Sequence, residues 1–269
     1  MTQLVADYTL ERLSRWGVTH IFGYPGDGIN GLIGAMRRHG DELQFVQPRH
    51  EEMAAFMACA YAKWTRRVGV CMATSGPGAI HLLNGLYDAL KDHQPVLAIV
   101  GQQKRISLGA DYQQEVDLPV LFKDVASQFC HMCTQPAQMR QLIDRALRIS
   151  LAERTVTCII VPNDVQEMPA EDAPDREHGA VFTGVGYEAP RIVPRAEQLE
   201  RAARVLTKAN GSRCSSARAL WMPPRRCSSA RTASAPASPR HCSAGRQCRM
   251  ICRMSREPSA CSAPRPATT

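Results

Sequence analysis

The feature that most constrains this chain is the regular alternation, over residues 3–165, of short apolar runs with amphipathic stretches. The short runs are apolar along their whole length, which is typical of strands that are buried on both faces. In the longer stretches the apolar residues recur at helical spacing. Strands and helices that alternate in this way indicate a parallel sheet. We therefore expect an α/β fold, in which a doubly wound parallel sheet has helices on both faces.

The individual segments can be placed from the same pattern. Strands are expected over residues 18–22, 43–47, 68–74, 95–101 and 155–162. Helices are expected over residues 4–17, 29–40, 50–65, 79–92, 116–126 and 136–153. Gly17 and Gly40 close the first two helices, as glycine commonly does at a helix C-terminus.

The alternation stops near residue 168. Residues 169–194 are rich in proline, glycine and acids and predict a linker. Residues 195–210 predict an amphipathic helix that opens a second domain. Residues 211–269 show no periodic pattern, so the second domain is expected to be truncated. The predicted organisation is a domain over 1–168, the linker, this first helix and a C-terminal tail.

The tail has a composition unlike that of the rest of the chain. It holds 11 Arg, no Lys and one acid, and it is therefore strongly basic. This tail accounts for the positive net charge of the whole chain, which is +8. Ser, Ala, Arg, Pro and Cys make up 45 of its 59 residues. Such a segment cannot bury enough apolar surface to offset its chain entropy, so we expect it to be disordered.

The origin of this tail has two interpretations. Its amino acids are those that GC-rich coding DNA gives when it is read out of phase, and we expect a shifted reading frame. The alternative is a basic disordered arm that binds nucleic acid. Under the first interpretation no nucleic-acid partner is expected.

Composition also bears on the compartment and on metal binding. No run of about 18 apolar residues occurs, so no transmembrane segment is expected. The N-terminal residues lack the basic and then apolar layout of a secretory signal, which favours a cytoplasmic protein with reduced cysteines. The spacings of cysteine and histidine match no metal site, and none is expected.

Two loops and one acid stand out as candidates for chemistry. The loops Gly23–Gly28 and Thr74–Gly78 directly follow predicted strands, and open α/β sheets bind ligands at the carboxyl ends of their strands. Glycines there let the backbone approach a flat ring closely. Glu51 lies in the first turn of a predicted helix. A tight turn without a ligand, and an acid that the helix dipole stabilises, are the alternatives.

Several motifs in the same order resemble a known family. They are QPRHEEMAAFMACAYA (47–62), ATSGPGAIHLLNGLYDAL (73–90) and HQPVLAIVGQ (93–102). They resemble the N-terminal, pyrimidine-binding domain of thiamine diphosphate enzymes, in the group of pyruvate oxidase, quinone-linked pyruvate dehydrogenase and acetolactate synthase. The resemblance covers residues 3–168, and residues 195–210 are similar to the start of the group's middle domain.

The resemblance implies roles for particular residues. Glu51 matches the catalytic glutamate, which hydrogen-bonds N1′ of the aminopyrimidine ring and favours the imino tautomer. Gln114 matches a residue on the substrate side. The remaining matches border the aminopyrimidine ring: Pro25, Gly26, Thr74, Pro77, Gly78 and Asn84. The loop Gly23–Gly28 then belongs to the pyrimidine half of the pocket, although its Gly-Asp-Gly resembles a magnesium motif.

The resemblance also implies a reaction, cofactors and partners. We expect a fragment of an enzyme that decarboxylates pyruvate or another 2-oxo acid, of the pyruvate oxidase or quinone-linked dehydrogenase type. An acetolactate synthase is the alternative within the family, and a non-catalytic dimerising fragment is the alternative outside it. The family's magnesium and FAD sites lie in domains absent here, so only the pyrimidine half of thiamine diphosphate would bind and the chain alone would be inactive. The family's site lies between subunits, which implies a homodimer or tetramer.

Overall fold

The structure is a computed structural model that describes residues 2–40, 43–171 and 181–208. The prediction of a disordered, frameshifted tail over residues 211–269 lies outside the described residues. The described chain forms two units, which divide at Pro190. The first holds the sheet, and the second contributes helix α8 (Ala196–Lys208), where a helix was expected. Its assignment to a truncated domain stays a prediction.

A six-stranded parallel sheet forms the centre of the first unit, in the order β2-β1-β3-β4-β6-β5. The strands are β1 (His20–Gly23), β2 (Gln44–Val46), β3 (Gly69–Ala73), β4 (Val96–Gln102), β5 (Cys130–Met132) and β6 (Val156–Pro162). From β1 the chain turns outward to β2 and then returns to place β3 on the other side of β1. The carboxyl ends of β1 and β3 therefore form a topological switch point, where such sheets bind ligands.

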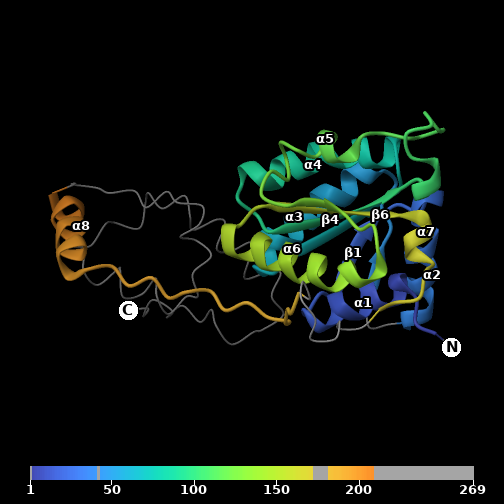
Figure 1. Cartoon of the computed structure of the whole chain (residues 1–269). Helices are drawn as coiled ribbons and strands as arrows, with labels where there is room; N and C mark the ends of the chain where they lie inside the picture. The colour runs from blue at the N-terminus through green and yellow to red at the C-terminus, as the bar shows by residue number, and fades with distance from the viewer. Residues whose placement is uncertain (1, 41–42, 172–180, 209–269) are drawn as a thin grey trace, which may run out of the picture. The chain divides into compact units, whose positions relative to one another are not determined.

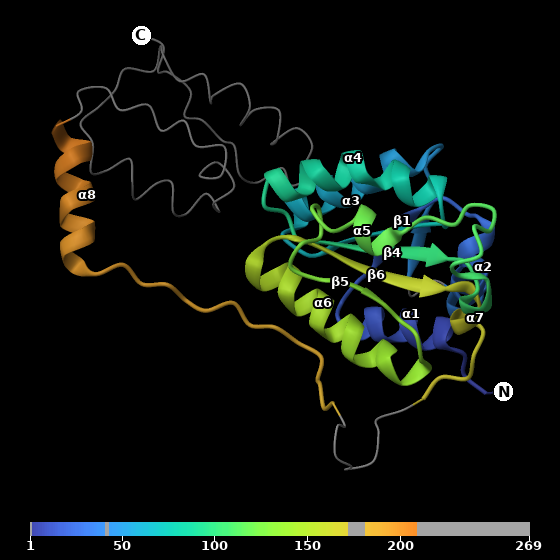
Figure 2. The same cartoon turned by 45° about the horizontal axis from the view of Figure 1, so that its top comes forward.

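Helices cover both faces of this sheet (Figures 1 and 2). On one face lie α1 (Val5–Arg15), α2 (Asn30–His39) and α6 (Met139–Glu153); on the other lie α3 (Glu51–Thr65), α4 (Pro77–Lys91) and α5 (Leu118–Leu121). A short helix, α7 (Asn163–Gln166), follows β6. The predicted doubly wound α/β fold is confirmed. None of the described helices is long and apolar enough to cross a membrane.

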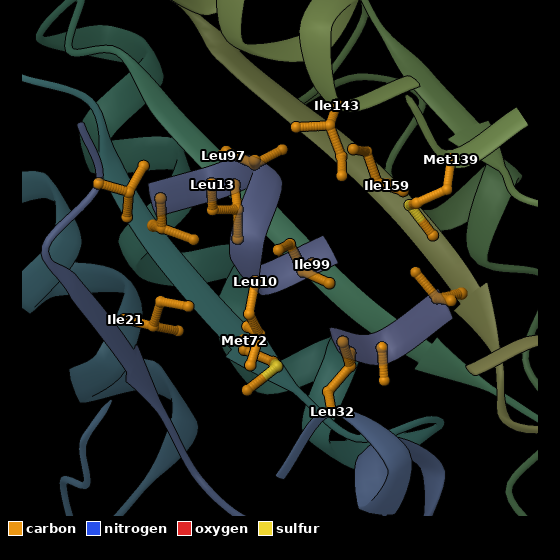
Figure 3. Close-up of a cluster of buried hydrophobic side chains, with 14 of the residues drawn as sticks. Leu10, Leu13, Ile21, Leu32, Met72, Leu97, Ile99, Met139, Ile143 and Ile159 are labelled. Atoms are coloured by element: carbon orange, nitrogen blue, oxygen red, sulfur yellow. The ribbon is translucent and has the colours of Figure 1, made fainter. Parts of the chain in front are cut away.

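Neighbouring residues of the central strands alternate between two hydrophobic cores. In β4, Leu97 and Ile99 face the core below α1, α2 and α6, as Figure 3 shows, whereas Ala98 and Val100 face α3 and α4. Every residue of β4 is buried. Burial of alternate residues on opposite faces explains why these strands read as continuous apolar runs.

Helices α3 and α4 approach each other closely because small residues line their contact. A Cβ added to Gly85 of α4 would lie 2.6 Å from the Cβ of Ala55 and 2.6 Å from the backbone nitrogen of Phe56. No larger side chain fits there without a backbone shift. The two helices therefore hold the residues at their N-termini in a defined relative position.

A buried ion pair joins α1 to α6. Asp144, fully buried, accepts hydrogen bonds from Arg12 Nε at 2.9 Å and from Arg12 Nη2 at 2.6 Å. Trp16 Nε1 donates to the same carboxylate at 2.7 Å. The pKa of Arg12 is raised, chiefly by its hydrogen bond to Asp144.

The structure differs from the expected elements in three places, the first of which is the short helix α7, which was not predicted. Strand β5 was not predicted, since it has three residues at the edge of the sheet and none of them is fully buried. The helix expected over 116–126 is helical only in α5, and turns follow it. Its apolar spacing is nevertheless explained, because Leu118, Phe122 and Val125 are all buried in the core below α3 and α4.

Candidate functional site

The loops that follow β1 and β3 meet at the switch point, with Thr74 between them. Thr74 Oγ1 accepts a hydrogen bond from the backbone N–H of Gly28 at 2.9 Å. A Cβ on Gly26 would lie 2.6 Å from Thr74 Cβ, and one on Gly78 would lie 2.7 Å from Thr74 Cγ2. Both glycines are therefore required for the two loops to approach each other.

Glu51 begins α3 and points its carboxylate toward these loops. His50 caps the helix, and its Nδ1 accepts from the backbone N–H of Glu52 at 3.3 Å. The Glu51 side chain is only 12% exposed. A Cβ on Gly78 would lie 3.3 Å from Glu51 Oε1, so the first turn of α4 packs directly beside the carboxylate. The opposite carboxylate oxygen is 3.0 Å from Nδ1 of His81 on α4.

The loop over residues 109–115 reaches the same region. A Cβ on Gly76, whose φ is +60°, would lie 2.7 Å from the backbone oxygen of Gln114. Gln114 itself adopts a positive φ of 62°, which is uncommon for a residue other than glycine. The Glu115 carboxylate holds this loop by accepting from the N–H groups of Gly109 at 2.6 Å and Tyr112 at 3.0 Å. These backbone hydrogen bonds lower the pKa of Glu115.

The structure brings most of the predicted site residues together. Glu51, Gly26, Thr74 and Gly78 surround one point, and Gln114 packs against the turn before α4. The predicted residues Pro25 and Pro77 lie in the same two loops. Asn84 is a partial exception, because its side-chain amide donates to Glu52 and not to Glu51. The spacing of histidines in the sequence did not indicate that His50 and His81 flank Glu51 from two helices.

A polar cavity of about 350 Å³ opens next to this point, at the carboxyl ends of β1, β4 and β6. It is lined by Asp27, Gly28, Asn30, Gln103, Lys104, Ser107, Tyr112 and Asn163. A mostly buried carboxylate, two glycine turns and a polar cavity lined by Gly28 are the kinds of group that hold a small polar ligand, although Glu51 itself does not line the cavity.

Comparison with known families agrees with this geometry. The family model described as "Thiamine pyrophosphate enzyme, N-terminal TPP binding domain" matches residues 3–120. This part of the chain belongs to that family. Thiamine pyrophosphate is another name for thiamine diphosphate, and the match includes the loops after β1 and β3, Glu51 and Gln114.

Three relatives illustrate the breadth of the similarity. The putative thiamine pyrophosphate-containing protein YdaP of Bacillus subtilis is 40% identical over 199 residues, which are 74% of this chain and 33% of the relative. Pyruvate oxidase of Lactiplantibacillus plantarum is 40% identical over 162 residues, 60% of this chain and 27% of the relative. Acetolactate synthase of Arthrospira platensis is 36% identical over 198 residues, 71% of this chain and 34% of the relative. The chain thus spans about a third of their lengths.

Proposed function

We propose that this domain binds the aminopyrimidine ring of thiamine diphosphate, with Glu51 hydrogen-bonded to N1′. The observation that carries the proposal is the placement of the mostly buried Glu51 carboxylate directly beside Gly78, where Thr74 joins the two glycine loops next to a polar cavity. The residues fit the group because the acid is mostly buried and lies beside Gly78, which has no side chain of its own to cover it. When bound, thiamine diphosphate supplies a C2 carbanion that attacks the carbonyl carbon of a 2-oxo acid.

The roles of the residues follow from their positions. Glu51 holds a proton at N1′ and thereby favours the imino form of the ring. Gly26 and Gly78 let the backbone lie against the ring faces. Gln114, held close to this turn by the 109–115 loop, lies on the side from which a substrate would approach. Asn84 acts through Glu52, to which it is hydrogen-bonded, and so positions the start of α3.

The reaction we propose is the decarboxylation of pyruvate or a similar 2-oxo acid, with an acceptor of the pyruvate oxidase type. The chain is 40% identical to pyruvate oxidase and 36% identical to acetolactate synthase, which supports the pyruvate oxidase type as the first candidate. Acetolactate synthesis is the second candidate. Magnesium, the diphosphate and FAD need further protein groups. Among the described residues, the one cluster of three metal-ligand types is His50, Glu51 and His81, which lacks the oxygen-rich set that magnesium prefers.

We further propose that a second copy of the chain packs against the exposed side of α3 and α4. Met53 and Trp64 of α3 and Ile80 of α4 are 49%, 62% and 44% exposed, and large exposed apolar residues favour an interface. A non-catalytic dimer is the alternative function that this face supports. In either case the described domain needs a diphosphate-binding partner domain for turnover.

Ligand-observed NMR with thiamine tests the proposal on the full chain. We expect saturation transfer to the pyrimidine protons in preference to the thiazolium protons, and its loss in Glu51→Gln. Glu153→Gln, at the exposed end of α6, serves as the control and should bind as the unaltered chain does. Equal transfer to both rings, or unchanged binding by Glu51→Gln, would refute the assignment. With thiamine diphosphate, magnesium and pyruvate, the chain alone should release no carbon dioxide.

A further inference from the structure

Three side chains of metal-ligand type converge where α3 and α4 begin. Each of His50, Glu51 and His81 offers a ligand atom that lies within 4.8 Å of the other two. His81 Nδ1 is 3.0 Å from Glu51 Oε2, and the rings of His50 and His81 lie 4.3 Å apart between centroids. Two of these residues belong to the start of α3 and one to α4.

We propose that these three side chains form a binding site for a divalent transition-metal ion, of which Zn²⁺ fits best. Zn²⁺ takes imidazole nitrogen and carboxylate oxygen at about 2.0–2.2 Å, and its tetrahedral ligand atoms then lie roughly 3.4 Å apart. The ligand atoms, which lie within 4.8 Å of one another, reach this value when the two exposed imidazole rings rotate and give up their Nδ1 contacts with the Glu52 N–H and the Glu51 carboxylate for the ion. Three protein ligands leave a fourth position open to water.

The backbone beneath these ligands is held firmly. Gly85 packs against Ala55 without room for a Cβ, so α3 and α4 are in close contact one turn after His81. One turn after His81, Asn84 donates a hydrogen bond to Glu52 and ties the two helices again. The other Glu52 oxygen lies 3.9 Å from His50 Nδ1. Coordination through Nε2 would place the His50 proton on Nδ1, which would then exchange its hydrogen bond from the Glu52 N–H for one to this carboxylate, as beside many metal-ligating imidazoles.

Charge and access decide whether an ion can enter. The dipoles of α3 and α4 point their positive ends at the cluster and disfavour a cation. Glu51 and Glu52 together offset this with two negative charges, and carboxylate coordination is stronger than the residual dipole effect. The side chains of His50 and His81 are 45% and 43% exposed, so the ion reaches them directly from solvent. An ion bound there would occupy Glu51, and it would therefore exclude the aminopyrimidine ring if the proposed function is correct.

Histidine footprinting on the full chain tests the site. The chain is treated with diethyl pyrocarbonate with and without Zn²⁺, and modification is measured for each histidine by peptide mass spectrometry. Zn²⁺ should lower modification of His50 and His81 by about tenfold or more, while His93 and His131, exposed elsewhere, keep their reactivity. Because each histidine is read separately, zinc held by cysteine thiols does not enter the result.

Variants distinguish a metal site from a simple hydrogen bond. Glu51→Gln should raise the Zn²⁺ concentration needed for protection at least about tenfold, as for the loss of a supporting ligand, whereas Glu153→Gln should not. His81→Ala should abolish protection of His50. Circular dichroism confirms that each variant is folded. Equal protection of His93, or unchanged protection in folded Glu51→Gln, would overturn the proposal. Thiamine binding is measured without zinc, so the two proposals fail separately.

Discussion

Replacing Asp144 by alanine should destabilise the first unit more than any surface substitution. The carboxylate is fully buried and accepts three hydrogen bonds, two from Arg12 and one from Trp16, across a sequence separation of 132 residues for Arg12. Without it, the guanidinium of Arg12, which is 8% exposed, remains in the interior as an unpaired charge, and the indole N–H loses its acceptor.

The magnitude follows from what is left behind. Breaking a buried ion pair from one side costs about 3–5 kcal/mol, because the remaining charge has neither water nor a partner. For a domain of this size that corresponds to a fall in melting temperature of roughly 6–20 °C. With a urea m-value of about 2 kcal/mol per molar, the unfolding midpoint should fall by roughly 1.5–2.5 M. A pair replaced on both sides costs much less, because no charge is stranded.

Urea unfolding followed by circular dichroism measures these differences. Asp144→Ala should lose about 3–5 kcal/mol of unfolding free energy, and the double variant Arg12→Met with Asp144→Leu should recover most of it. Arg38→Ala removes an exposed ion pair with Asp7 and should cost under about 1 kcal/mol. The reasoning is wrong if Asp144→Ala costs as little as Arg38→Ala, or if the double variant is as unstable as the single one.

Three further predictions rest on individual contacts. Thr157 is fully buried, and within the described residues its hydroxyl has no hydrogen-bond partner, so Thr157→Val should raise the free energy of unfolding by about 1 kcal/mol. Thr9→Val, which removes a hydrogen bond of 2.7 Å to the Val5 carbonyl, should not be stabilising. Equal effects of the two substitutions in urea unfolding would contradict this reasoning. Gly85→Ala should destabilise by about 1–3 kcal/mol through overpacking, but Gly34→Ala, whose Cβ meets only the end of a flexible side chain, should stabilise by up to about 1 kcal/mol. If Gly85→Ala were stabilising, α3 and α4 would have to move apart at little cost in free energy, and the overpacking argument would be wrong. The pKa of Glu115 is lowered from 4.5 in the folded chain, so its hydrogen bonds to the 109–115 loop are present above pH 4.5 and are lost as the pH falls through the lowered pKa. The NMR chemical shifts of the loop amides should change over that pH range, and Glu115→Gln should abolish the change.

Much of the fold could be predicted because its signals are local. The strands β3, β4 and β6 are buried on both faces, so each is a continuous apolar run whatever its neighbours are. The edge strand β5 was not predicted because it is short and none of its residues is fully buried. The segment 116–126 was interpreted as a helix because its buried residues recur at helical spacing. That spacing indicates which residues face the core. In this segment a series of turns after α5 places the same residues in the core without a continuous helix.

The candidate site was predicted in part. The positions of the glycine loops and Glu51 were predicted because they directly follow a strand or begin a helix, and their roles, which rest on the family resemblance, stay a prediction. Asn84 was placed on the correct helix, but its hydrogen bond to Glu52 depends on the contact of α3 with α4. The convergence of His50 and His81 on Glu51 depends on the same contact and has no signature in the spacing of histidines.

The sequence by itself determined the class of fold, the ends of the strands that carry loops, and the acid that begins α3. These properties arise from the periodicity and turn chemistry of adjacent residues. Only the tertiary structure decided that Thr74 joins Gly26 to Gly78 and that Asp144 pairs with Arg12. Such contacts are set by the order of the strands and by the close approach of two helices, because residues far apart in the chain meet only after the strands have paired in that order.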